Sequence, residues 1–365
     1  MDLAFQHVNT LPASTWNWLG VNDAKIAAAL PETKPYQGET SVSAVPSGVT
    51  VSDRTFPVPA IETGMGAEAV KFAEEHRNCG VTIKASAGVR AEQPLFLTYQ
   101  IDETNPAVVD VNTIVAEENS EVTVVMSYCS KGNISGFHGG VTKLYAGKNA
   151  VIHLVQVQLL NDSCLHYDDI GALAGENGEI DVVQAELGAK HAFSGCKTRL
   201  AGKHSRLNMN SIYFGDRDRS IDINYIAEHI GRNTQSEIDV NGALLDRSRK
   251  IFRGTIDFVR GAKQAVGHER EYSLLFSPNV RNRTAPLILC AEEDVQGQHA
   301  ATTGKIDENK LFYLMSRGLD ELTAKKLVIE AQFQPATDKI PDSKLRSAIS
   351  DYVKERLNGI ESISL

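Results

Sequence analysis

The chain has 365 residues, of which 42% are hydrophobic and 23% are charged, a composition typical of a folded globular protein. Its net charge of −9 argues against a nucleic-acid-binding surface, because such surfaces depend on clustered lysine and arginine. No apolar run approaches the roughly 18 residues of a membrane span, and no signal peptide is recognisable at the start. The five cysteines are scattered without a CxxC pattern, which indicates reduced thiols in a cytoplasmic protein.

The first part of the chain, residues 1–79, is expected to form a helical and extended segment. Residues 1–34 are typical of a short helical lead-in, since good helix formers fill 22–30 just before a proline. Residues 31–63 are rich in proline, glycine, serine and threonine and predict an extended connector. A helix is predicted over Gly64–His76.

The middle of the chain repeats one short pattern, in which turn residues are followed by alternating apolar and polar residues. The copies lie 27 to 30 residues apart, and they begin at Asn119, Gly147, Gly175, Gly202, Gly231 and Gly261. A constant period of this length with strand-type alternation signals a solenoid. A second strand follows in each repeat, which favours a parallel β-helix over residues 80–290 rather than a leucine-rich repeat or a propeller. Hairpins of an ordinary β-sandwich remain the alternative fold.

The last part of the chain, residues 291–365, is expected to form a helical domain. Three helices are predicted, each with an aspartate at its N-cap: Glu308–Arg317 after Asp307, Glu321–Phe333 after Asp320, and Ser343–Leu357 after Asp342. Gly318 stands where a glycine often ends a helix. Helices at the end of a solenoid either cap its last coil or dock a partner, and the pattern leaves both open.

Few motifs in the chain suggest catalysis. A phosphate-binding loop, a GxSxG elbow and an HExxH motif are all missing. The acidic runs at Asp168–Asp169 and Glu292–Asp294 suggest a carbohydrate-binding or carbohydrate-cleaving β-helix, which would need two carboxylates across a cleft. Aromatic residues make up only 7% of the chain, which is few for stacking on sugars. This function remains the alternative.

The densest group of metal-capable residues lies between Cys290 and His299. A thiolate, three carboxylates and an imidazole fall within ten residues, a mixture of soft and hard ligands that suits iron or zinc better than calcium. The candidate metal ligands are His299, Cys290 and Glu293. The alternative is a buried cysteine beside a solvated acidic turn, with the imidazole of His299 bonded to a backbone carbonyl.

Three segments in this region resemble a known family. Phe276–Val295, His299–Asp307 and Leu311–Leu319 are similar, in that order, to the C-terminal signature of the SufB/SufD family, the scaffold proteins of the SUF iron–sulfur cluster assembly system. The resemblance covers about residues 141–333, and Leu11–Trp18 also resembles the N-terminal motif of SufD-type chains. It implies a right-handed β-helix flanked by helical segments.

The resemblance also implies partners and a role. Family members bind the ABC-type ATPase SufC through C-terminal helices, and they pair with each other through the β-helix. The chain would then be a non-enzymatic scaffold that pairs with a SufB-like chain or with itself, while SufC hydrolyses ATP. His299 takes the place of the family histidine near which iron or a cluster assembles, so we expect a transient iron or iron–sulfur cluster and none stably bound to the isolated chain. The expected partner-binding residues are Leu311, Phe312, Tyr313, Arg317 and Leu327.

The chain departs from the family pattern at two places. The family motif HGAT reads His-Ala-Ala-Thr here, so Ala300 replaces glycine, and the glutamate that follows the histidine in SufB-type chains is missing. The strand Glu271–Phe276 has no cysteine where SufB-type chains carry an essential one, and Leu275 is nearest to that place. Both departures indicate a SufD-like chain.

Overall fold

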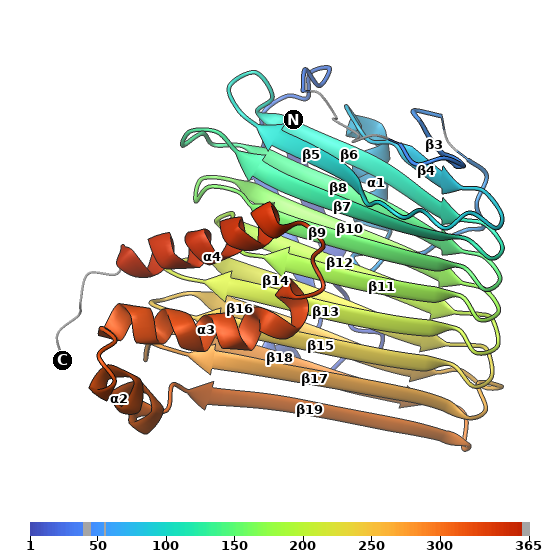
Figure 1. The fold of residues 1–365 in the computed structure, drawn as a ribbon. Coiled ribbons are helices and arrows are strands. Elements are labelled where there is room, and N and C mark those ends of the chain that lie inside the picture. The colour runs from blue at the N-terminus through green and yellow to red at the C-terminus, as the bar shows by residue number, and fades with distance from the viewer. Residues whose placement is uncertain (39–44, 55, 360–365) are drawn as a thin grey trace.

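The computed structural model describes residues 1–38, 45–54 and 56–359, and its main body is a β-solenoid (Figure 1). From β4 onward, successive strands alternate between two sheets. Within each sheet, the strands of successive coils pair in parallel. The nine-stranded sheet contains β3 (Val49–Ser52), β4 (Thr82–Ala85), β6 (Ala107–Ala116), β8 (Phe137–Ala146), β10 (Leu165–Ala174), β12 (His191–Leu200), β14 (Ser220–His229), β16 (Arg249–Phe258) and β18 (Arg281–Cys290). The eight-stranded sheet contains β5 (Leu95–Ile101), β7 (Glu121–Ser130), β9 (Val151–Leu159), β11 (Glu179–Glu186), β13 (Arg206–Gly215), β15 (Gln235–Leu244), β17 (Ala265–Leu275) and β19 (Val295–Lys305).

The predicted solenoid is therefore confirmed, with two strands in each coil. The alternation of apolar residues places every second side chain between the sheets: in β7 these are Val122, Val124, Met126 and Tyr128, all fully buried. A single coil cannot bury these side chains alone, because the coils above and below cover them. The right-handed sense of the coils stays a prediction.

The start of each predicted repeat is a turn that needs an unusual backbone conformation. Asn119, Asn149 and Asn177 have φ between +52° and +60° and lie one above the other in successive coils. The side-chain amide of Asn149 donates to Asn119 at 2.8 Å, and that of Asn177 donates to Asn149 at 2.8 Å. Asparagine tolerates the left-handed region better than most residues, which explains the turn signal in the sequence.

The helical lead-in predicted for residues 22–30 is wrong. This stretch is the strand β2 (Ala24–Ala29), which pairs antiparallel with β1 (Asp2–Val8). Its alternate residues Ala24 and Ile26 are buried, and this burial outweighs the helix propensity of an alanine-rich segment. Only the short 3₁₀ turn Asn17–Leu19 is helical there.

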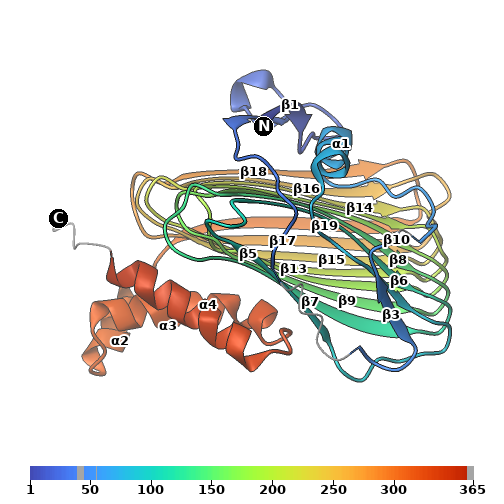
Figure 2. The same cartoon turned by 90° about the horizontal axis from the view of Figure 1, so that it is seen from above.

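The helix predicted next is confirmed as α1 (Ala67–His76). Together with β1 and β2 it covers the outer face of the nine-stranded sheet, where Phe5 and Phe72 meet Tyr167 (Figure 2). The predicted connector contains the strand β3, and its residues 39–44 and 55 lie outside the described residues.

The three C-terminal helices are confirmed as α2 (Glu308–Ser316), α3 (Glu321–Thr337) and α4 (Ser343–Asn358). The side chains of Asp307, Asp320 and Asp342 accept hydrogen bonds from first-turn amides, as the N-cap prediction requires. Gly318 has a φ of +96° after α2, a conformation that glycine adopts without strain. No helix within the described ranges is long and apolar enough to cross a membrane.

These helices lie beside the solenoid and not over its end. Ile329 and Phe333 of α3 and Val353 of α4 pack into one cluster with Ile212 and Phe214 of β13, on the outer face of the eight-stranded sheet. Figure 2 shows α3 and α4 on this face and α1 on the opposite one. The helices therefore cover a flank, and the last coil stays open.

Candidate functional site

The open end of the solenoid is formed by β18 and β19. Each is the terminal strand of its sheet, so one edge of each lacks a strand partner among the described residues. β19 is exposed along nearly its whole length, whereas β17 directly beside it alternates mainly between buried and partly buried residues. An exposed, extended edge is a template for another strand. This end of the molecule thus presents two open strand edges.

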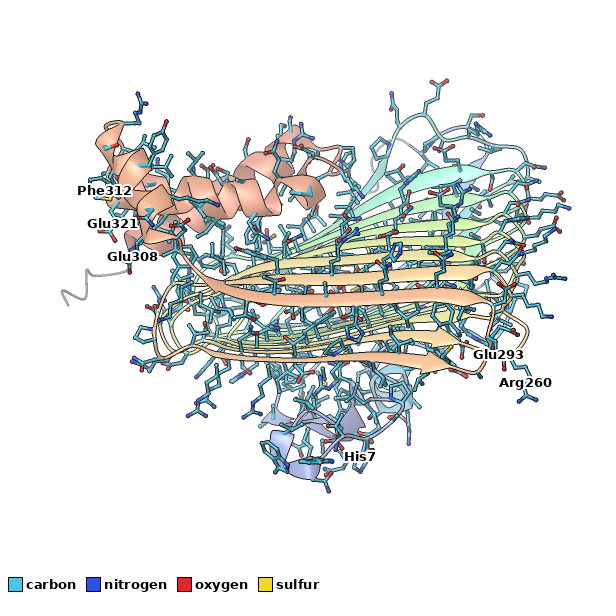
Figure 3. The ribbon with its side chains drawn as sticks, turned by 90° about the horizontal axis from the view of Figure 1, so that it is seen from below. His7, Arg260, Glu293, Glu308, Phe312 and Glu321 are labelled. Carbon is cyan, nitrogen blue, oxygen red and sulfur yellow. The ribbon has the colours of Figure 1, made fainter. Side chains whose placement is uncertain are left out.

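The structure brings together two of the three predicted metal ligands. Cys290 ends β18, is exposed, and donates its S–H to the backbone carbonyl of Glu292 at 3.1 Å. Glu293, labelled in Figure 3, follows in the turn. Both residues line a shallow pocket together with Gly297. Among the described residues, no group of three or more histidines, cysteines, aspartates or glutamates is arranged to hold a metal ion.

His299 does not line that pocket. It lies four residues beyond the start of β19, about 13 Å along the strand at the usual rise per residue. Its register partner in β17 is Glu269. The His299 side chain is exposed, as its place on the last coil requires.

Glu269 is a residue that sequence reasoning missed. It is 1% exposed, and neither of its carboxylate oxygens has a hydrogen-bond partner in the part of the chain that the structure describes. Burial, and secondarily the nearby Glu271, raise the pKa of Glu269 to about 8. The sequence could have shown this from the spacing of two, because Gly267, Glu269 and Glu271 lie on the same side of their strand. That side faces the core.

Glu271, two residues further on, is by contrast fully paired. It forms a buried ion pair with Lys250 and accepts hydrogen bonds from Ser273 at 3.1 Å and Thr284 at 2.6 Å. Burial lowers the pKa of Lys250, and the pairing with Glu271 opposes that shift. These contacts join β16 and β17 of one coil to β18 of the last coil, and they stabilise the fold.

Four of the predicted partner-binding residues lie on α2 or at its C-cap, and the fifth, Leu327, lies on α3. Phe312 is 73% exposed, Tyr313 and Leu327 are also exposed, and Leu311 is half-buried. The guanidinium of Arg317 lies 5.2 Å from the ring centre of Tyr313. Figure 3 shows Phe312 projecting from α2, away from the sheets. Large exposed apolar side chains gathered in one place mark interaction sites.

The acidic runs do not form a pair of carboxylates across a cleft. Asp168 faces the space between the sheets, while Asp169 faces outward and accepts from the Met65 amide at 2.7 Å, and both are buried. Glu292 accepts from the Gly261 amide at 2.9 Å and so orders a turn. The arrangement that a carbohydrate-cleaving β-helix needs is not met by these residues.

Comparison with known proteins agrees with the resemblance in the C-terminal segments. The model of the family described as "SUF system FeS cluster assembly, SufBD core domain" matches residues 99–332, more than half of the chain. The iron–sulfur cluster assembly protein SufD of Bacillus subtilis is 25% identical over 77% of this chain and 64% of its own length. SufD of Escherichia coli is 25% identical over 76% of the chain and 66% of its own length. A SufBD family protein of Pyrococcus horikoshii is 28% identical over 72% and 59%. The chain thus spans between 59 and 66% of the length of these curated relatives.

Proposed function

Because the chain belongs to the SufBD family of SUF-system iron–sulfur cluster assembly proteins, we propose that it is a SufD-like, cytoplasmic, non-enzymatic scaffold. It binds a SufC-type ATPase through α2 and α3. It pairs through the open end of its solenoid with a SufB-like chain or with a second copy of itself. ATP hydrolysis belongs to the ATPase, and the scaffold holds the place where iron and sulfide meet.

The observation that carries this proposal is the open last coil. The two outer faces of the solenoid are covered, one by the N-terminal segment and α1, the other by α3 and α4. The strands β18 and β19 are left with bare edges, although they carry His299 and Cys290. A partner that pairs with these edges would enclose both residues between two chains.

The SufD-like assignment is supported by the residues that differ from the SufB pattern. Ala300 follows His299, so no glutamate stands beside the imidazole on β19. The strand β17 ends without a cysteine, so the chain has no thiol at the place where SufB-type chains carry an essential one. Within this proposal, His299, Cys290 and Glu293 remain the candidate ligands for transient iron or a cluster, which is the substrate of the assembly.

The ATPase contact is tested by capture of a SufC-type ATPase with Phe312→Ala. A central aromatic anchor removed from an interface costs about 2 kcal/mol or more, so we expect binding to weaken about 30-fold or more. Arg317→Ala should also weaken it, because the guanidinium lies over Tyr313. The measurement is the dissociation constant by calorimetry.

Trp18→Ala is the matched control. Trp18 is as exposed as Phe312, but it lies on the N-terminal segment, away from the helices. We expect this variant to bind like the unmodified chain. Unchanged binding of the Phe312→Ala chain would remove α2 from the ATPase interface.

A further inference from the structure

Glu269 needs an explanation that the fold does not supply. A buried carboxyl group with no partner for either oxygen is costly, and native proteins usually satisfy such groups or use them. Its neighbour Glu271 shows that the same strand can supply full pairing, through Lys250 and Thr284. The unpaired group is the one that lies beside His299.

Glu269 and His299 point to the same side of their sheet. They are register partners on the adjacent parallel strands β17 and β19, whose backbones lie about 4.8 Å apart. Side chains at odd positions of β17 face the inside of the solenoid, since Glu269, Glu271 and Ser273 are all buried. The corresponding face of β19 also turns inward, because Asn282 of β18 donates to Thr303 across the coil at 2.9 Å. His299 shares that face.

The other described neighbours of Glu269 give its carboxyl group no hydrogen bond. A Cβ placed on Gly254 would lie 2.3 Å from the Glu269 carboxyl carbon, so the carboxyl group rests directly over that glycine. The register partner of Gly254 in the last coil is Pro286, and that of Glu271 is Ala301. Neither side chain can donate a hydrogen bond or bind a cation. Among these described register neighbours in the last coil, His299 is therefore the one whose side chain can share a ligand with Glu269.

We propose that Glu269 and His299 are two ligands of a divalent-cation site that takes Fe²⁺, the remaining ligands coming from the chain that covers the open end. A carboxylate oxygen and an imidazole nitrogen are a ligand set that suits Fe²⁺. Two ligands from one chain agree with the finding that the described residues contain no group of three or more. The identity of the covering chain rests on the proposed function, whereas the pairing of Glu269 with His299 does not.

This site differs from the one centred on Cys290 and Glu293. Those two residues lie at the turn between β18 and β19, and Glu269 does not line their pocket. The structure thus separates two candidate sites that the sequence merged into one, and substitutions can tell them apart.

The test is Co²⁺ binding, as a stand-in for Fe²⁺, measured by calorimetry and by the visible spectrum. The chain is used alone and paired with a SufB-type chain. We expect Glu269→Gln and His299→Ala each to weaken Co²⁺ binding about tenfold or more, because even loss of a group that only supports a metal ligand weakens binding about 10- to 100-fold. Glu176→Gln, a carboxylate-to-amide change at an exposed turn between β10 and β11, should bind like the unmodified chain. The glutamine has nearly the same shape as the glutamate, so the thermal midpoint of Glu269→Gln should change little.

Three results would overturn the proposal: no Co²⁺ binding by the unmodified chain in either state, binding by Glu269→Gln equal to that of the unmodified chain, or loss of binding in Glu293→Gln only. Capture of the SufC-type ATPase by the same Glu269→Gln chain separates the two proposals. Normal capture with weakened Co²⁺ binding supports both. Absent capture by every chain, with weakened Co²⁺ binding in Glu269→Gln, would remove the scaffold assignment and leave the cation site.

Discussion

At the scale of single residues, the inside of this solenoid carries charged groups whose states differ sharply over short distances. Glu271 and Lys250 neutralise each other in the core, and breaking such a pair would cost about 3–5 kcal/mol. Glu269, on the same face two residues away, has no partner in the described chain. The sequence shows two glutamates at inward positions, but only the three-dimensional register decides which one meets the lysine.

Asp169 provides a prediction about pH. Burial beneath the N-terminal segment raises its pKa from the ordinary value of 3.8 to about 7, against the opposing hydrogen bond from the Met65 amide. Between these two pH values the unfolded chain releases a proton that the folded chain keeps. The free energy of unfolding should therefore fall as the pH rises from about 4 to about 7, and stay level for this group outside that window.

Asp169→Asn removes the titrating group but keeps an oxygen that can accept from Met65. We expect the slope of unfolding free energy against pH, measured by urea denaturation, to become flatter across that window. Asp218→Asn is the control, because Asp218 is exposed and pairs only with Arg247 at the surface. Equal slopes for the Asp169→Asn and unmodified chains would show that Asp169 is charged throughout.

At the scale of elements, the turns at the starts of successive repeats share a residue in the left-handed conformation. His204 occupies the same left-handed position, φ +61°, that Asn177 occupies one coil earlier and Asn233 one coil later. For residues other than glycine and asparagine, this conformation usually lowers the stability of the folded chain. His204→Asn should therefore raise the free energy of unfolding by about 1 kcal/mol, and it would extend the side-chain bonds that link Asn119, Asn149 and Asn177.

Lys203→Asn is the matched control for this prediction, measured by urea unfolding. Lys203 is the exposed neighbour of His204, and it is not among the residues with positive φ. This change should leave stability nearly unaltered. A His204→Asn chain no more stable than the Lys203→Asn chain would show that the left-handed turn carries little strain.

The elements themselves were predictable where their signals were local. An aspartate at the N-cap before an apolar stripe identified all three C-terminal helices, because capping depends on only a few neighbouring residues. The alanine-rich stretch at 24–29 gave the wrong answer, since pairing with β1 and burial of Ile26 decide its conformation. The helix predicted to end at Phe333 continues to Thr337, and this additional turn includes the buried Ala336.

At the scale of the whole molecule, the repeat period predicted the solenoid, but it could not show which surfaces are covered. The C-terminal helices lie on the eight-stranded sheet, so they leave the last coil bare. Cys290 and His299 are nine positions apart in the sequence, and the turn between β18 and β19 places them in different surroundings. The neighbour that matters for His299 is Glu269, thirty positions away, which one coil of the solenoid brings alongside.

The most direct test of the central claim, that the open end and the helix surface are binding faces, is hydrogen–deuterium exchange. Exchange is compared between the chain alone and the chain assembled with a SufB-type chain and a SufC-type ATPase. The account predicts slower exchange in the complex over β18, β19, α2 and the start of α3, with β11 and β13 unchanged. A complex that forms while β18 and β19 exchange as fast as in the free chain would contradict it.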